Sequence, residues 1–72
     1  MTEQQARQLT HGTRVHVQEA TFDSGRKTFQ NVQGIYKAWG TGLARVELDL
    51  VEPYLGSSHP FVWVRPEHME LV

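Results

Sequence analysis

The stretch Val32–Leu50 reads Val-Gln-Gly-Ile-Tyr-Lys-Ala-Trp-Gly-Thr-Gly-Leu-Ala-Arg-Val-Glu-Leu-Asp-Leu, and it organises the rest of the chain. Its second half alternates apolar and polar residues, which is the period of a half-buried β-strand. Gly40–Gly42 interrupts the stretch with residues that accept a positive φ. The stretch therefore predicts strands over 32–39 and 43–51 that pair antiparallel across a tight turn, with one face formed by Ala44, Val46, Leu48 and Leu50.

Shorter strands are predicted on both sides of this hairpin. Arg14–Gln18 alternates in the same way, and Phe61–Arg65 forms a fourth strand. Between the first two strands, Thr21–Phe29 predicts a protruding two-stranded loop, with Phe22 and Phe29 flanking its base.

The C-terminal third is interrupted by proline. Pro53 lacks the amide proton that a strand needs, so it should end the third strand and open the surface loop Tyr54–Pro60. Pro66–Met69 predicts one tight helical turn of the 3-10 type. Glu70–Val72 is then a short closing strand that returns to the first strand.

The first ten residues differ from the remainder. Met1–Leu9 is polar and rich in glutamine, and Thr2 and Gln5 have the spacing of a helix capping box. A helix of this length is marginal in water. We therefore expect a flexible or weakly helical tail over 1–10 and one β domain over 11–72.

The predicted order is that of an all-β protein with five strands and one 3-10 turn before the last strand. This order resembles the SH3-like small barrel over roughly 12–72. The residues that carry the resemblance are Gly12–Val15, Gly34, Val62–Pro66 and Met69–Val72. The resemblance implies a single five-stranded barrel whose protruding first loop is the Thr21–Phe29 segment.

Composition narrows the possible partners. The chain has 72 residues, no cysteine and a formal charge of −1, whereas proteins that bind nucleic acid usually carry a basic excess. The longest apolar run is Phe61–Val64, much shorter than a membrane span. We expect a cytoplasmic protein that does not contact a membrane, with nucleic acid a less favoured partner.

The aromatic residues predict a binding face. If Val62 and Val64 point inward, Phe61, Trp63 and Arg65 point outward, and on strand 32–39 the same parity exposes Trp39. Exposed aromatic groups of this size usually mark an interface. The predicted function is a non-enzymatic binding or assembly module, whose partner is a protein or a second copy of the chain. The predicted contact residues are Trp39, Tyr54, Phe61, Trp63 and Arg65, unless a sharp bend turns either tryptophan into the core.

Two other resemblances carry alternative functions. Gly12–Val17 is similar to the opening of KOW barrels, which implies nucleic-acid binding through Arg14, Arg26, Lys27 and Lys37. Tudor barrels instead hold a cation in an aromatic cage. The candidates for such a cage here are Trp39, Tyr54, Phe61 and Trp63.

The chain is also similar to the type II dihydrofolate reductases, oligomers of SH3-like barrels around a pore. The similarity rests on Gly12, Arg14 and Val15, on Gln33-Gly34 followed by Trp39, and on Pro66. The Val-Gln-Ile-Tyr substrate signature of that family is replaced by Val62–Arg65. The residues that would contact substrate and cofactor are therefore different, and a pore-type reductase is the third alternative.

No metal, cofactor or catalytic group is predicted. The four histidines, His11, His16, His59 and His68, have no metal-ligand spacing. The serines at 24, 57 and 58 fall in predicted turns. Glu47 and Asp49 share one face of a strand with Arg45 beside them, and charge pairing with Lys37 and Arg14 across the strands is the more ordinary role for such carboxylates.

Overall fold

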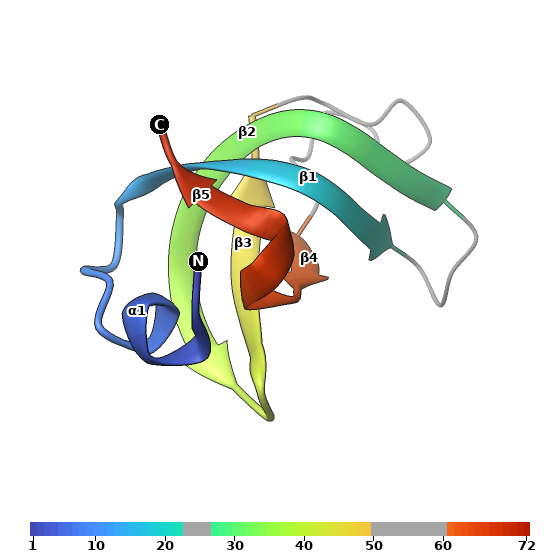
Figure 1. Cartoon of the computed structure of the whole chain (residues 1–72). Coiled ribbons are helices and arrows are strands. Elements are labelled where there is room, and N and C mark those ends of the chain that lie inside the picture. Colours follow the sequence, from blue (N-terminus) through green and yellow to red (C-terminus); the bar gives the residue numbers. More distant parts are fainter. Residues whose placement is uncertain (23–26, 50–60) are drawn as a thin grey trace.

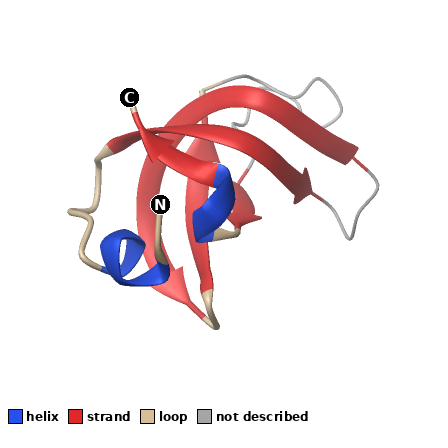
Figure 2. Cartoon of the chain, in the orientation of Figure 1, coloured by secondary structure: helices blue, strands red, loops and turns tan. Residues whose placement is uncertain are grey.

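The computed structural model describes residues 1–22, 27–49 and 61–72. These residues form a small, mostly β protein with one short α-helix and one 3-10 turn (Figure 2). No helix within the described ranges is long and apolar enough to cross a membrane. The elements are α1 (Glu3–Arg7), β1 (Arg14–Phe22), β2 (Lys27–Gly40), β3 (Leu43–Leu48), β4 (Phe61–Val64), η2 (Pro66–His68) and β5 (Met69–Leu71).

The five strands form one antiparallel sheet whose pairings close on themselves. β1 pairs with β2, β2 with β3 and β3 with β4. β4 then returns to β1 through the pair Thr21 and Trp63, and among the described strands β5 pairs with β1 alone. β1 and β2 are the longest strands, and both curve strongly around the remaining ones (Figure 1).

The predicted hairpin at the centre of the chain is confirmed. Gly40 pairs with Leu43, and the two residues between them both have positive φ, 52° at Thr41 and 79° at Gly42. Two consecutive positive φ values are typical of the two-residue turn that matches strand twist. β3 ends at Leu48, and the predicted Pro53 stop and Tyr54–Pro60 loop lie outside the described residues.

The described parts of the segment predicted as a protruding loop, 21–22 and 27–29, belong to the long antiparallel pair of β1 and β2, and 23–26 lie outside the described residues. β1 and β2 remain paired as far as Phe22 and Lys27. Phe29 is opposite Ala20, and both side chains are buried, whereas the side chain of Phe22 lies outside the described residues. The regular pairing lapses at Asn31, whose φ is 54°, and this lapse lets Phe29 join the same core as Val17.

A second irregularity corrects the predicted orientation of Trp39. The register of β2 against β3 shifts between Tyr36 and Ala38, which marks a β-bulge. A bulge inserts one residue and so reverses the alternation of faces beyond it. Trp39 is therefore opposite the buried Ala44, and it packs, partly buried, against the core instead of facing outward.

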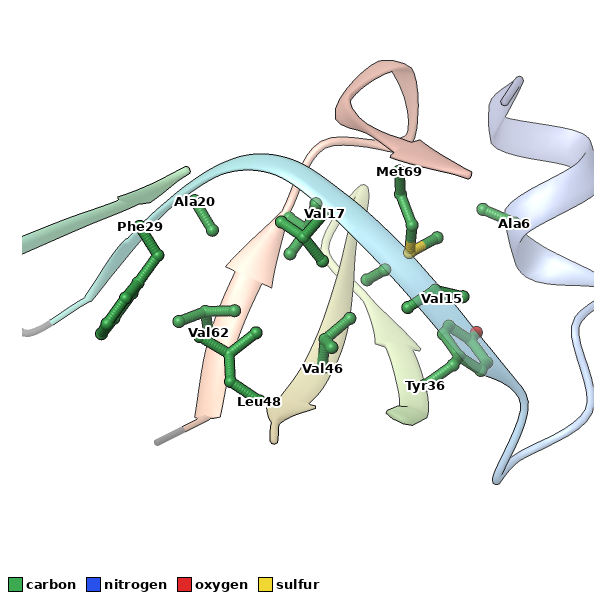
Figure 3. Packing of buried hydrophobic residues seen from close by; sticks show 12 residues of the cluster. Ala6, Val15, Val17, Ala20, Phe29, Tyr36, Val46, Leu48, Val62 and Met69 are labelled. Carbon is green, nitrogen blue, oxygen red and sulfur yellow. The ribbon is translucent and has the colours of Figure 1, made fainter. Parts of the chain in front are cut away.

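Apolar side chains from every strand fill the core. The largest fully buried side chains are those of Tyr36, Leu48, Met69 and five valines. Figure 3 shows Val46, Leu48 and Val62 on neighbouring strands pointing into the same space. The core residues are Ala6, Val15, Val17, Ala20, Phe29, Tyr36, Ala44, Val46, Leu48, Val62, Val64 and Met69.

The N-terminal segment is a capped helix that packs on this core. The Thr2 hydroxyl accepts from the Gln5 amide at 3.1 Å, and the Gln5 side chain accepts from the Thr2 amide at 2.9 Å, so the capping box is complete. Ala6 is fully buried and points toward Met69 of β5 (Figure 3). This packing stabilises a helix that is too short to be stable alone, where the sequence predicted a flexible or weakly helical tail.

Candidate functional site

Two large aromatic rings lie on the outer face of β4. Along this strand, Val62 and Val64 are buried, while Phe61 is 40% and Trp63 is 47% exposed. Strict alternation over four residues produces this arrangement, because successive side chains of a strand point to opposite faces. The predicted outward orientation of Phe61 and Trp63 is thus what the structure shows.

Arg45 of β3 lies against both rings. It is the cross-strand partner of Trp63, and its guanidinium carbon is 5.9 Å from the Trp63 ring centroid. The same carbon is 4.7 Å from the centroid of the Phe61 ring. Both distances are within the range of a cation–π contact. Arg45, Phe61 and Trp63 are called the aromatic face below.

A groove borders the aromatic face on the side of β1. Its volume is about 370 Å³, and Trp63 forms part of its wall. An ideal Cβ on Gly40 would lie 3.9 Å from the Trp63 ring, so the indole rests near the end of the β2–β3 hairpin. The groove is lined by Glu19, Ala20, Thr21, Leu43, Trp63, Arg65 and His68.

Most cations of the described strands lie beside carboxylates. Arg14 binds Asp49, and the Lys37 ammonium is 4.0 Å from a Glu47 oxygen. These two pairs confirm the predicted charge pairing of Glu47 and Asp49 with cations on other strands. The nucleic-acid alternative relies on Arg14 and Lys37, whose charges are thereby partly neutralised, while Arg26 and the side chain of Lys27 lie outside the described residues.

The remaining predicted contact residues separate in space. Trp39 and Trp63 lie on opposite faces of the sheet, so they cannot line one aromatic cage of the Tudor type. Arg65 lines the groove beside Trp63 but is also 3.8 Å from a Glu67 oxygen. Tyr54 lies outside the described residues.

Arg45 is the functional candidate that the sequence prediction missed. The sequence placed it among the surface charges of its strand, beside Glu47 and Asp49. Its alternation with Ala44 and Val46 indicated that it faces outward, but not which residue lies beside it. That neighbour depends on the register of β3 against β4, and twelve residues, 49–60, separate the two strands in sequence.

A second hollow lies between α1 and β5. Its volume is about 440 Å³, and its walls include Met1, Gln5, Gln8, Leu9, Glu70 and Leu71. Within the described parts of the chain β5 pairs with β1 alone, and its residues Glu70 and Leu71 form one wall of this hollow. The site contains Leu71, which is 60% exposed and lies on a different element from the aromatic face.

The described residues contain no group of three or more histidine, aspartate or glutamate side chains that could hold a metal ion. On the described surface, large apolar groups and an arginine come together at the aromatic face and its groove.

No protein-family model matches this chain, and no curated protein or solved structure matches it either.

Proposed function

We propose that the chain is a non-enzymatic binding module that contacts a protein partner through the aromatic face. The observation that carries this proposal is the exposure of Phe61 and Trp63 side by side with Arg45 stacked on them. Tryptophan and arginine are the residue types that most often dominate the binding energy of protein interfaces. The groove beside Trp63 offers a place for one further apolar side chain.

The exposure of these rings is costly for so small a protein. Each aromatic side chain has about 150–250 Å² to bury, so the exposed fractions leave roughly 200 Å² of ring surface in water. At about 25 cal/mol per Å², covering that surface is worth about 5 kcal/mol. The stability of a small domain is about 5–15 kcal/mol in total. A partner that covers the aromatic face would therefore recover a substantial free energy.

The size of the surface favours a short segment of a partner over a stable pair of identical chains. A standard interface buries about 800 Å² on each side. That is a little less than a fifth of the 4514 Å² accessible surface of the chain. The two exposed rings supply only a small part of such an area. Self-association, predicted from the sequence, remains the alternative, and a solution mass at micromolar concentration tests it.

We also propose that the closed set of strand pairings is an SH3-like barrel. The support is the circuit from β1 through β2, β3 and β4 back to β1, followed by the η2 turn and β5. Barrels of this kind have surfaces suited to short peptide segments, but a fold alone does not establish a function. An experimental structure in which β4 does not pair with β1 would contradict this assignment.

The binding proposal is tested by selecting short random peptides on the immobilised wild-type protein. The selected peptides are then measured against Trp63→Ala and against Leu71→Ala, a matched control in which an exposed apolar residue is removed from β5. We expect Trp63→Ala to weaken binding by at least about tenfold, because interface tryptophans are frequent hot spots. Leu71→Ala should leave the affinity unchanged.

Thermal melts of the same variants separate binding from folding. Because Trp63 is half exposed, its truncation should cost only about 1–2 kcal/mol of stability. Peptides that bind Trp63→Ala as tightly as the wild type would overturn the proposal. If Trp63→Ala does not fold, Phe61→Ala, which removes the neighbouring ring, answers the same question.

A further inference from the structure

Arg45 of the aromatic face differs from the other lysine and arginine side chains that the structure describes in and directly after the strands. Arg14, Lys37 and Arg65 each lie within reach of a carboxylate. Arg45 is exposed, and it forms no ion pair with any residue in the described parts of the chain; its contacts are with the two rings. Its charge is therefore available to a ligand.

The rings also hold this arginine in place. A guanidinium group has five N–H donors in one plane, and when it stacks on aromatic rings the donors at its edge remain free. Ordering a long, flexible side chain on binding normally carries an entropic cost. Phe61 and Trp63 restrict Arg45 before any ligand arrives, so much of this cost is removed.

We infer that the ligand is a peptide segment in which an aspartate or glutamate lies next to an aromatic or aliphatic residue. This inference rests on the proposed function and names the chemistry of its partner. The carboxylate accepts two hydrogen bonds from the free edge of Arg45, the geometry that a guanidinium group favours. The apolar neighbour covers the Trp63 ring and enters the groove beside it.

Charge complementarity favours a peptide over nucleic acid as the occupant. The groove is lined by Glu19 as well as Arg65, and Glu47 follows two residues after Arg45 on the same face of β3. A phosphate backbone would bring many negative charges near these carboxylates, whereas a peptide can bring one. The formal charge of the chain, −1, agrees with a ligand of low charge.

The experiment uses the peptides selected on the wild-type protein, each synthesised again with its acidic residue changed to the matching amide. Both forms are titrated against the wild type and Arg45→Gln in a double-mutant cycle. We expect the amide form to bind the wild type at least about tenfold more weakly, as for the loss of a charged hydrogen bond. The two forms should bind Arg45→Gln with nearly equal affinity.

Two further variants sharpen the result. Arg45→Lys keeps the charge but loses the planar pair of donors, so it should restore only part of the preference for the acidic peptide. Arg14→Gln removes an exposed cation outside the aromatic face and should leave the preference intact. Melting curves establish whether each variant is folded. If Arg45→Gln does not fold, the reduced preference of Arg45→Lys for the acidic peptide tests the role of Arg45.

The outcomes separate this inference from the proposed function. Some peptides could require Trp63 for binding and yet bind equally well in their acid and amide forms. That result would contradict the inference of an acidic ligand, but it would still support a binding module. If the selected peptides bind Trp63→Ala as tightly as the wild type, or if no peptide binds, both the inference and the proposed function are contradicted. Binding of a single-stranded oligonucleotide that requires Arg45 would replace the peptide with nucleic acid.

Discussion

The two faces of β4 differ in a way that separates folding from binding. Its inward residues, Val62 and Val64, are small and fully buried, whereas its outward residues, Phe61 and Trp63, are large and half exposed. Successive side chains of a strand point to opposite faces, so the same strand places its two valines in the core and its two aromatic side chains outside it. Adjacent residues of one strand therefore serve different purposes.

The largest predicted effect comes from placing a charge on the inner face. Val64→Asp would bury a carboxylate among aliphatic side chains with no partner, and burying an unpaired charge costs several kcal/mol. We expect a loss of more than about 4 kcal/mol, which is most of the stability of a domain at the lower end of the usual range of about 5–15 kcal/mol. Urea titration followed by circular dichroism measures this loss.

The same charge on the outer face is the matched control. Trp63→Asp places the carboxylate in water and opposite Arg45, so it should cost only about 1–2 kcal/mol. A loss of stability at Trp63→Asp equal to that at Val64→Asp would mean that the two faces are not distinct.

Replacing a glycine by alanine adds one methyl group, and this change can be made where strands pack closely and near the outer face. Gly34 lies where β2 pairs with both β1 and β3, and a Cβ there would be 2.5 Å from the Glu47 carbonyl oxygen. Because backbone cannot move aside easily, Gly34→Ala should cost about 1–3 kcal/mol. The measurement is the midpoint of urea unfolding at constant slope.

Gly40→Ala is its counterpart near the outer face. The added Cβ would be 3.9 Å from the Trp63 ring, an ordinary van der Waals contact. We therefore expect a change within about 0.5 kcal/mol of zero. If Gly40→Ala destabilises the protein more than Gly34→Ala does, the close approach of β2 and β3 is not what limits packing at Gly34.

The smallest effect concerns the one phenol in the described core. Tyr36 is 1% exposed, and desolvation by burial raises its pKa above the ordinary value of 10.0. In the unfolded chain the phenol loses its proton near pH 10, while the folded chain retains it. Stability is thus fully present below about pH 10 and falls as the pH rises through the folded pKa.

Tyr36→Phe removes this dependence. Unfolding free energies of the two proteins, measured from about pH 8 to about pH 11, should diverge only at the alkaline end, where the wild type loses stability faster. Parallel curves over the whole range would show that burial of the Tyr36 hydroxyl does not perturb its ionisation.

The strands that alternate without interruption were predictable from sequence. β3 and β4 show the expected faces residue by residue, and Gly42 in the turn between β2 and β3 has the positive φ that glycine accepts readily. β2 was not predictable in the same way. It contains the lapse at Asn31 and the bulge after Tyr36, and each changes which face the following residues occupy.

The candidate site shows the same division. Phe61 and Trp63 lie on a regular strand, so counting residues was enough to place them outside. Trp39 follows a bulge, and counting placed it on the wrong face. Arg45 was known to face outward, but its contact with the two rings required the register of β3 against β4.

The amino-acid sequence by itself determined the alternating strands, the tight turn between β2 and β3 and the capping box of α1, because each depends on residues close together in the chain. The tertiary structure alone decided where β2 bulges, how β3 and β4 are aligned and that Ala6 of α1 is buried in the core. These features depend on hydrogen bonds and packing between distant residues, whose best alignment is settled only when all the strands are present together.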